Sequence, residues 1–180
     1  RLLALHQIAF GFMRTNPDSC KVYAGIYERL SQSLGYKDHA ANATHLRGIA
    51  FYFMGQLDSA TTSLKKSLKY RGPAGDKAAK ASTLNVIGAV YMQQGNHAQA
   101  MINYMACLKI SEEIGDNRGI SGSNHNIGRI YAQQGEPEKA LSHYHQSLLH
   151  KDSTNILGIA EEYEVIGSMN ADLGNASIAE

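Results

Sequence analysis

The sequence predicts an all-α fold, an α-solenoid of stacked antiparallel helix pairs. Two observations support this prediction: the same residue types return about every 40 positions, and each period holds two amphipathic segments with helical spacing. No segment of useful length alternates apolar and polar residues, so we expect no β-sheet. One helix pair cannot bury its own apolar face, whereas stacked pairs share a continuous core. The 180 residues are therefore expected to form about four and a half repeats of one array.

Three series of glycines define the period. Their members lie 39 or 40 residues apart and are Gly48, Gly88, Gly128 and Gly167; Gly55, Gly95, Gly135 and Gly174; and Gly35, Gly75 and Gly115. Small and aromatic residues recur between them, among them Phe51, Tyr91 and Tyr131; Ala60, Ala100 and Ala140; and Ser67, Cys107 and Ser147. A small residue in the first helix of a pair lets the second helix approach closely. Gly115 is expected to end its helix in a left-handed conformation.

The elements follow this period along the chain. A divergent leading pair, whose first helix lacks the glycine, is expected over residues 1–35. Three complete pairs are expected over residues 40–75, 80–115 and 120–154, and a partial repeat over residues 159–180. The segment Ala176–Glu180 has the pattern of a further helix opening, and both ends of the sequence have the appearance of a fragment of a longer protein.

Eight positions in each of two periods resemble the tetratricopeptide repeat (TPR) family. They are Leu84, Ile87, Gly88, Tyr91, Gly95, Ala100, Tyr104 and Cys107, and then Asn124, Ile127, Gly128, Tyr131, Gly135, Ala140, Tyr144 and Ser147. The resemblance implies a right-handed TPR superhelix. The common repeat has 34 residues, so this longer repeat resembles those of animal spindle-orientation adaptors and of the TPR regions of bacterial sensor kinases and transcription regulators. Arg47 departs from the family pattern, because an apolar residue is usual there.

The resemblance also implies a concave groove lined by the first helices of the pairs. Counted from the small residue of each first helix, the positions −6, −3, −2, +1, +4 and +5 point away from the partner helix. The candidate peptide-binding residues at these positions are Asn42, His45, Tyr52, Asn85, Gln93, His125, Asn126, Arg129, Gln133 and Glu164. Asparagine amides both donate and accept hydrogen bonds, which suits the capture of an extended peptide backbone.

The expected groove surface changes along the chain, from apolar and aromatic in the first complete repeat to acidic in the partial one. A ligand with an apolar end and a basic end would match this gradient. The carboxylate clamp known in the family requires paired lysines and arginines on the first helices. Because Arg129 is the lone cation at a groove position of the two best repeats, we do not expect that clamp here.

Composition argues against several function classes. The chain has 17 basic and 16 acidic residues, a formal charge of +1, and so lacks the basic excess of a nucleic-acid-binding protein. No apolar run approaches the roughly 20 residues that cross a bilayer. Two cysteines are too few for a disulfide framework, and we expect Cys20 and Cys107 to be inert buried thiols.

No catalytic, metal-binding or phosphate-binding motif stands out, so we expect no enzymatic activity, no cofactor and no metal. The eight histidines are expected to lie at the surface, as is the pair Glu161 and Glu162. The leading interpretation is a module of a larger protein that binds a protein or peptide in its groove. The alternative is the sensory input region of a bacterial signalling protein. End-to-end self-association through the uncovered face of the last pair is also predicted.

Overall fold

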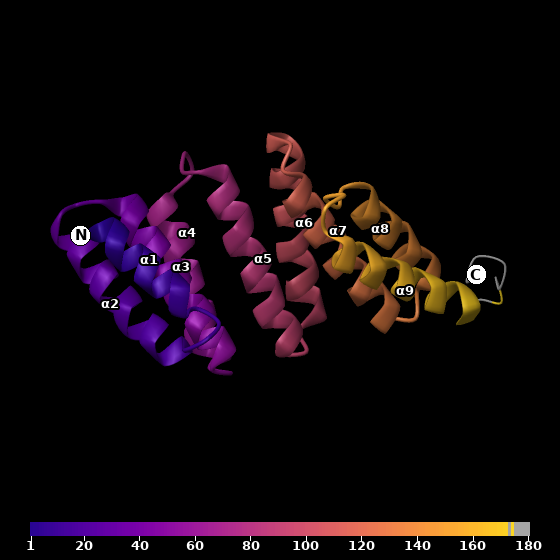
Figure 1. Cartoon of the computed structure of the whole chain (residues 1–180), viewed down its shortest axis with the longest axis horizontal. Coiled ribbons are helices and arrows are strands. Elements are labelled where there is room, and N and C mark those ends of the chain that lie inside the picture. The colour runs from indigo at the N-terminus through magenta and orange to yellow at the C-terminus, as the bar shows by residue number, and fades with distance from the viewer. Residues whose placement is uncertain (173, 175–180) are drawn as a thin grey trace. The chain divides into compact units, whose positions relative to one another are not determined.

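The computed structural model describes residues 1–172 and residue 174, and this part of the chain folds into nine α-helices without a strand (Figure 1). The helices are α1 (Leu2–Phe12), α2 (Pro17–Ser33), α3 (Lys37–Phe53), α4 (Leu57–Arg71), α5 (Lys77–Gln93), α6 (His97–Ile114), α7 (Asn117–Gln133), α8 (Pro137–Leu149) and α9 (Ile156–Asp172). The predicted all-α solenoid class is confirmed. None of the described helices is long and apolar enough to cross a membrane.

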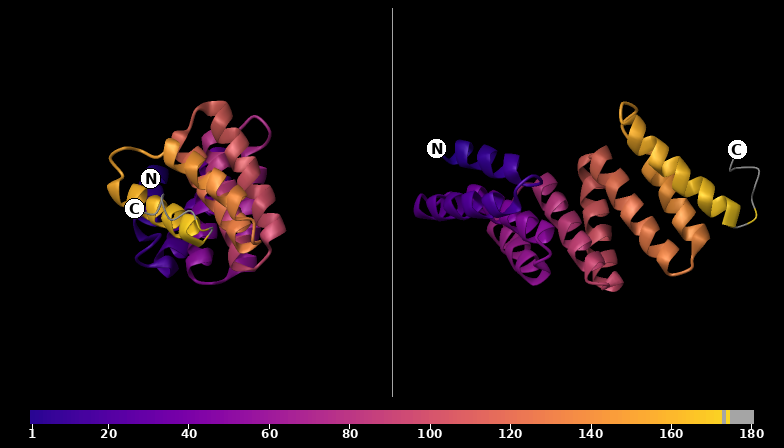
Figure 2. Two further views of the ribbon diagram at one scale, coloured as in Figure 1. Left: turned by 90° about the vertical axis from the view of Figure 1, so that its right-hand side faces the viewer. Right: turned by 60° about the horizontal axis from the view of Figure 1, so that its bottom comes forward.

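The chain divides into two compact units, which are described separately: unit 1 (residues 1–100) and unit 2 (residues 101–180). In unit 1 each helix from α1 to α5 packs against its successor, and α3 also contacts α1 and α5 (Figure 2). The first helices of the three pairs, α1, α3 and α5, therefore form one layer. The second helices, α2 and α4, lie outside this layer and fill the spaces between its members.

Gly48 provides the close contact expected within the α3/α4 pair. A Cβ atom at this position would lie 2.6 Å from Leu64 Cγ, and Leu64 is itself fully buried. A larger residue would push the two helices apart, because packed interiors have no spare volume at such a crossing. The small residue predicted from the period therefore sets the distance between these helices.

The helix ends follow local sequence signals. The Asn16 side chain accepts a hydrogen bond from the Ser19 backbone N–H at the start of α2, and Gly115 ends α6 with a φ of 69°, as predicted. The third glycine series fails between α4 and α5. There the left-handed residue is Gly72, whereas Gly75 has ordinary φ and packs against the Arg71 backbone, where a Cβ atom would clash.

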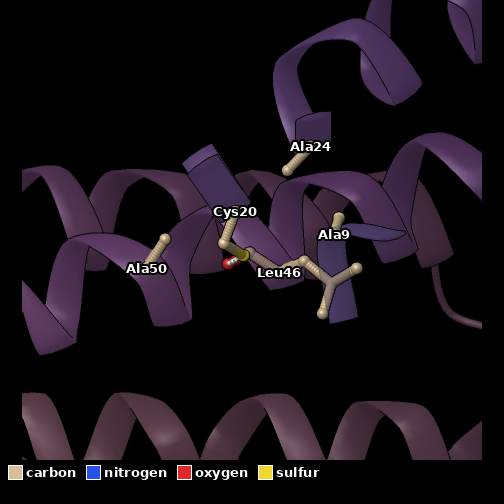
Figure 3. Close-up of a cluster of buried hydrophobic side chains, with 5 residues drawn as sticks. All are labelled: Ala9, Cys20, Ala24, Leu46 and Ala50. Atoms are coloured by element: carbon tan, nitrogen blue, oxygen red, sulfur yellow. Dashed lines mark hydrogen bonds between the residues drawn. The ribbon is translucent and has the colours of Figure 1, made fainter. Parts of the chain in front are cut away.

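A small hydrophobic cluster joins the leading helices to the first complete repeat. It consists of Ala9 from α1, Cys20 and Ala24 from α2, and Leu46 and Ala50 from α3 (Figure 3). The thiol of Cys20 is fully buried with its Sγ 3.6 Å from the Leu46 carbonyl oxygen, and burial raises its pKa to about 11. Cys107 is also buried. The prediction of buried cysteines is confirmed, and that of an unreactive thiol is supported at Cys20.

Arg47 has a structural explanation. Its Nη1 lies 2.5 Å from Oε2 of Glu28, a residue of α2 that is only 3% exposed, and the other carboxylate oxygen lies 2.8 Å from Lys66 Nζ. One buried carboxylate thus holds cations from α3 and α4. The unusual Arg47 is the charge partner that makes burial of Glu28 tolerable.

In unit 2, α8 packs against both α7 and α9 (Figure 2). A Cβ atom at Gly128 would lie 3.0 Å from the Tyr144 ring, and the core contains Ala140, Tyr144 and Ile166. Asn170 replaces the usual aromatic residue, and its buried amide donates to the Ile166 carbonyl at 3.0 Å. The helix predicted at Ala176–Glu180, and with it the face predicted for end-to-end association, lies outside the described residues.

Candidate peptide-binding pocket

Unit 1 contains a half-open pocket of about 250 Å³ in the layer formed by the first helices. It is lined by His6 and Phe10 of α1, Met13 directly after α1, Asn42, His45, Leu46 and Ile49 of α3, and Ser82 of α5. We call it the α1/α3/α5 pocket. Two of the ten candidate residues predicted from the sequence, Asn42 and His45, line it.

All eight lining residues lie at positions that the groove rule uses. On α3 they are at −6, −3, −2 and +1 from Gly48, and Ser82 is at −6 from Gly88. On α1 the buried small residue is Ala9, and the lining residues are at −3, +1 and +4 from it. Sequence reasoning missed these three because it looked for a glycine. An alanine 39 residues before Gly48, the spacing that also separates Gly128 from Gly167, was the available signal.

A buried guanidinium stands behind the pocket. Arg71, in the last turn of α4, donates from Nη2 to Asn42 Oδ1 at 2.7 Å. Asn42 in turn donates from its amide to the Tyr27 hydroxyl, which lies 2.7 Å from Nδ1 of His39. Burial lowers the pKa of Arg71, although the group remains a cation at neutral pH. Arg71 was missed in the sequence because it lies on a second helix, where the groove rule does not look.

His45 connects α3 to α5. Its Nδ1 lies 3.1 Å from Thr83 Oγ1, and the same hydroxyl donates to the Ala79 carbonyl at 2.8 Å. Since the threonine proton is used for Ala79, His45 must donate from Nδ1 and is neutral with that tautomer. Burial, together with the charges of Arg71 and His6, lowers the pKa of His45 to about 4.

His6 is the second histidine of the pocket. Its Nδ1 is buried and has no hydrogen-bond partner among the described residues. Its ring packs edge-on against Tyr27, with 5.8 Å between the ring centroids. Burial and the neighbouring His39 lower its pKa. The pocket therefore contains two histidines that favour the neutral form at pH 7.

The remaining candidates of unit 1 do not line the pocket. Tyr52 lies at the end of α3, where its ring meets that of Phe53 edge-on and packs against the α3/α4/α5 core. Asn85 is half-buried on α5, and Gln93 is exposed at the end of α5. The structure thus divides these five candidates into two that share a pocket and three that lie outside it.

In unit 2 the candidates lie on α7 and α9. His125 is turned toward α9, with its Nδ1 3.0 Å from Glu162 Oε2. Asn126 is half-buried, whereas Arg129, Gln133 and Glu164 are exposed. The five remain predicted binding residues, and no cavity among the described residues of unit 2 brings them together.

The prediction that Glu162 lies at the surface is wrong. Its side chain is 0% exposed, and Oε2 lies 2.5 Å from Lys151 Nζ in addition to its contact with His125. Burial alone would raise the pKa of Glu162, but the hydrogen bonds and charges of His125 and Lys151 hold it below its usual value. Glu162 therefore ties α9 to α7 and to the link that follows α8.

The expectation of surface histidines is also wrong for most of them. Half-buried histidines that contact a second helix include His6, His45 and His125, already described, and His143, whose Nδ1 lies 2.9 Å from Asn124 Oδ1. Burial lowers the pKa of His143. In the part of the chain that the structure describes, no three His, Cys, Asp or Glu side chains are grouped as a metal site requires.

Comparison with known proteins places this geometry in a family. Residues 80–148 match the tetratricopeptide repeat family. The fold is similar to that of apo RapI (17% identity, TM-score 0.86, 99% of this chain and 66% of that chain) and of BtubC from P. vanneervenii (13%, 0.72, 99% and 84%). It is also similar to a STAND signal-transduction ATPase with a tetratricopeptide repeat sensor from Pyrococcus horikoshii (16%, 0.73, 93% and 25%). At these identities the similarity establishes the fold. No curated protein sequence matches the chain.

Proposed function

We propose that this chain, a tetratricopeptide repeat protein and therefore an interaction module, binds a segment of a partner protein in the α1/α3/α5 pocket. One observation carries the proposal. Eight residues at groove positions of three successive first helices enclose a single half-open pocket. A pocket that combines an apolar wall with a few fixed polar groups is the usual form of a binding site.

The pocket offers both kinds of contact. Phe10, Met13, Leu46 and Ile49 provide apolar surface, and Phe10 is exposed enough to contact a ligand directly. Asn42 and His45 are held in place by their contacts with Arg71 and Thr83, so their hydrogen-bonding groups have fixed directions. A preorganised site of this kind loses little conformational entropy on binding.

The test is selection of a random-peptide phage library on the whole chain, followed by fluorescence anisotropy of the selected peptides. Ser82→Trp places an indole in the pocket from α5, where Ser82 is exposed. Ser142→Trp is the matched control, because Ser142 is an exposed helical serine on α8. We expect at least about tenfold weaker binding for Ser82→Trp and unchanged binding for Ser142→Trp. Failure to select any peptide, or equal binding by both variants, would overturn the proposal.

A second proposed function is sensory input in a signalling protein. It is supported by the fold similarity to the STAND ATPase, whose tetratricopeptide repeats are described as its sensor. In this role, occupation of the pocket would be the signal. The test is to express the full natural protein and measure the activity of any output domain with and without a selected peptide. A peptide-dependent change would support this role, and an unchanged output would contradict it.

A further inference from the structure

Arg71 is a buried charge without a counter-charge. The residue is only 7% exposed, and no carboxylate of the described residues forms an ion pair with it. Its Nε also lacks a hydrogen-bond partner among those residues. Glu28, the other strongly buried charge of unit 1, is paired with two cations instead. Because an unpaired buried charge destabilises a fold, a cation kept in this state points to a partner outside the chain.

The charge of Arg71 reaches the pocket through Asn42. A guanidinium only donates hydrogen bonds, so Asn42 must face Arg71 with Oδ1 and turn its amide N–H groups the other way. One of these groups serves Tyr27, and the pocket is lined by the same side chain. The end of the pocket nearest Asn42 therefore combines N–H donors with a positive charge in a poorly solvated site.

The distribution of charge along the chain favours the same sign of ligand. Residues 1–100 contain 12 Lys and Arg and 5 Asp and Glu, a formal charge of +7, whereas residues 101–180 contain 5 and 11, a charge of −6. The overall charge of +1 conceals this asymmetry. A strongly positive unit attracts anionic segments and accelerates their association.

We propose that the α1/α3/α5 pocket binds an acidic side chain of the partner segment together with an adjacent apolar side chain, with Arg71 as the buried counter-charge. This inference rests on the proposed function and names the chemistry of its ligand. The carboxylate is placed beside Asn42, and the apolar side chain packs on Phe10, Met13 and Ile49. The arrangement differs from the clamp known in the family, because its cation comes from the second helix of a pair.

The decisive measurement compares matched peptides. Each selected acidic peptide is paired with a counterpart in which its Asp and Glu residues are replaced by Asn and Gln. On the wild-type chain we expect the acidic peptide to bind about tenfold or more tightly than its amide counterpart, as for a charge-assisted hydrogen bond. In Arg71→Met the two peptides should bind alike, while binding of the amide peptide stays unchanged. Arg29→Met removes an exposed cation of α2 and should leave the acidic preference intact.

Arg71→Met is also expected to fold, because replacing a buried unpaired charge with an apolar side chain of similar length removes a desolvation penalty. Its urea midpoint should equal or exceed that of the wild type. Arg71→Lys supplies a second test, since a retained cation should keep a preference for the acidic peptide. An acidic preference that survives in Arg71→Met would overturn the inference.

The selection separates the two proposals. Selected peptides that lose binding in Ser82→Trp but bind equally as acids and amides would overturn the acidic ligand and leave the proposed function standing. A selection that yields no peptide would overturn both. Peptides that are acidic, dependent on Ser82 and indifferent to the amide exchange only in Arg71→Met are the expected result.

Discussion

Acidification tests the neutral state of His45 in the pocket. In the folded chain burial holds its pKa at about 4, against 6.5 for an unperturbed histidine. Between these values the unfolded chain binds a proton that the folded chain does not, so stability must fall as the pH falls. From about pH 8 to about pH 5 this one group should remove about 2 kcal/mol of unfolding free energy.

The assay is urea unfolding followed by circular dichroism at several pH values. The wild type is compared with His45→Gln, which keeps a donor for Thr83 but does not titrate. His145→Gln, at an exposed position of α8, is the matched control. The difference between the wild type and His45→Gln isolates His45 from the other groups whose pKa values are lowered by burial.

The expected result is a wild-type loss that exceeds the His45→Gln loss by about 2 kcal/mol over this range, with His145→Gln following the wild type. Equal losses in all three proteins would refute the assignment of His45 as a buried, neutral donor to Thr83. Such a result would also remove His45 from the fixed polar groups of the pocket, because a ring that titrates freely is exposed to water.

Three further predictions concern packing and buried charge. Gly48→Ala should destabilise the chain by about 1–3 kcal/mol, since its Cβ would lie 2.6 Å from Leu64, whereas Gly122→Ala meets nothing within 4 Å and should gain about 0.5–1 kcal/mol in helix propensity. Equal urea midpoints would contradict this pair. The Cys20 thiol should be alkylated only after unfolding, as read by peptide mass spectrometry, and rapid native labelling there would be inconsistent with its burial. Glu162→Gln should cost about 3 kcal/mol by leaving a half-buried lysine unpaired, and a loss below about 1 kcal/mol would show that the pair is not needed.

The features that the sequence predicts best are those that every repeat needs. Gly48 and Gly128 recur because each helix pair has the same close crossing, and Gly115 marks a helix end that the backbone can make only with a positive φ. Periodicity reports such shared requirements directly. It misplaces Glu162 and His125, because their contact joins residues 37 apart on different helices and occurs once in the chain.

The pocket illustrates why the same rule succeeds and fails at neighbouring positions. Positions −6 and −3 correctly select Asn42 and His45 as lining residues, and the same rule applied from Ala9 selects those of α1. No positional rule selects Arg71, since its role depends on the absence of a carboxylate within reach and not on its place in the period. A repeat fixes where its groove lies, whereas the ligand is determined by the charges that the repeats do not share. In this chain that difference is the unpaired guanidinium behind Asn42, which is why the acid–amide comparison on Arg71→Met tests function more directly than any change to the repeated positions.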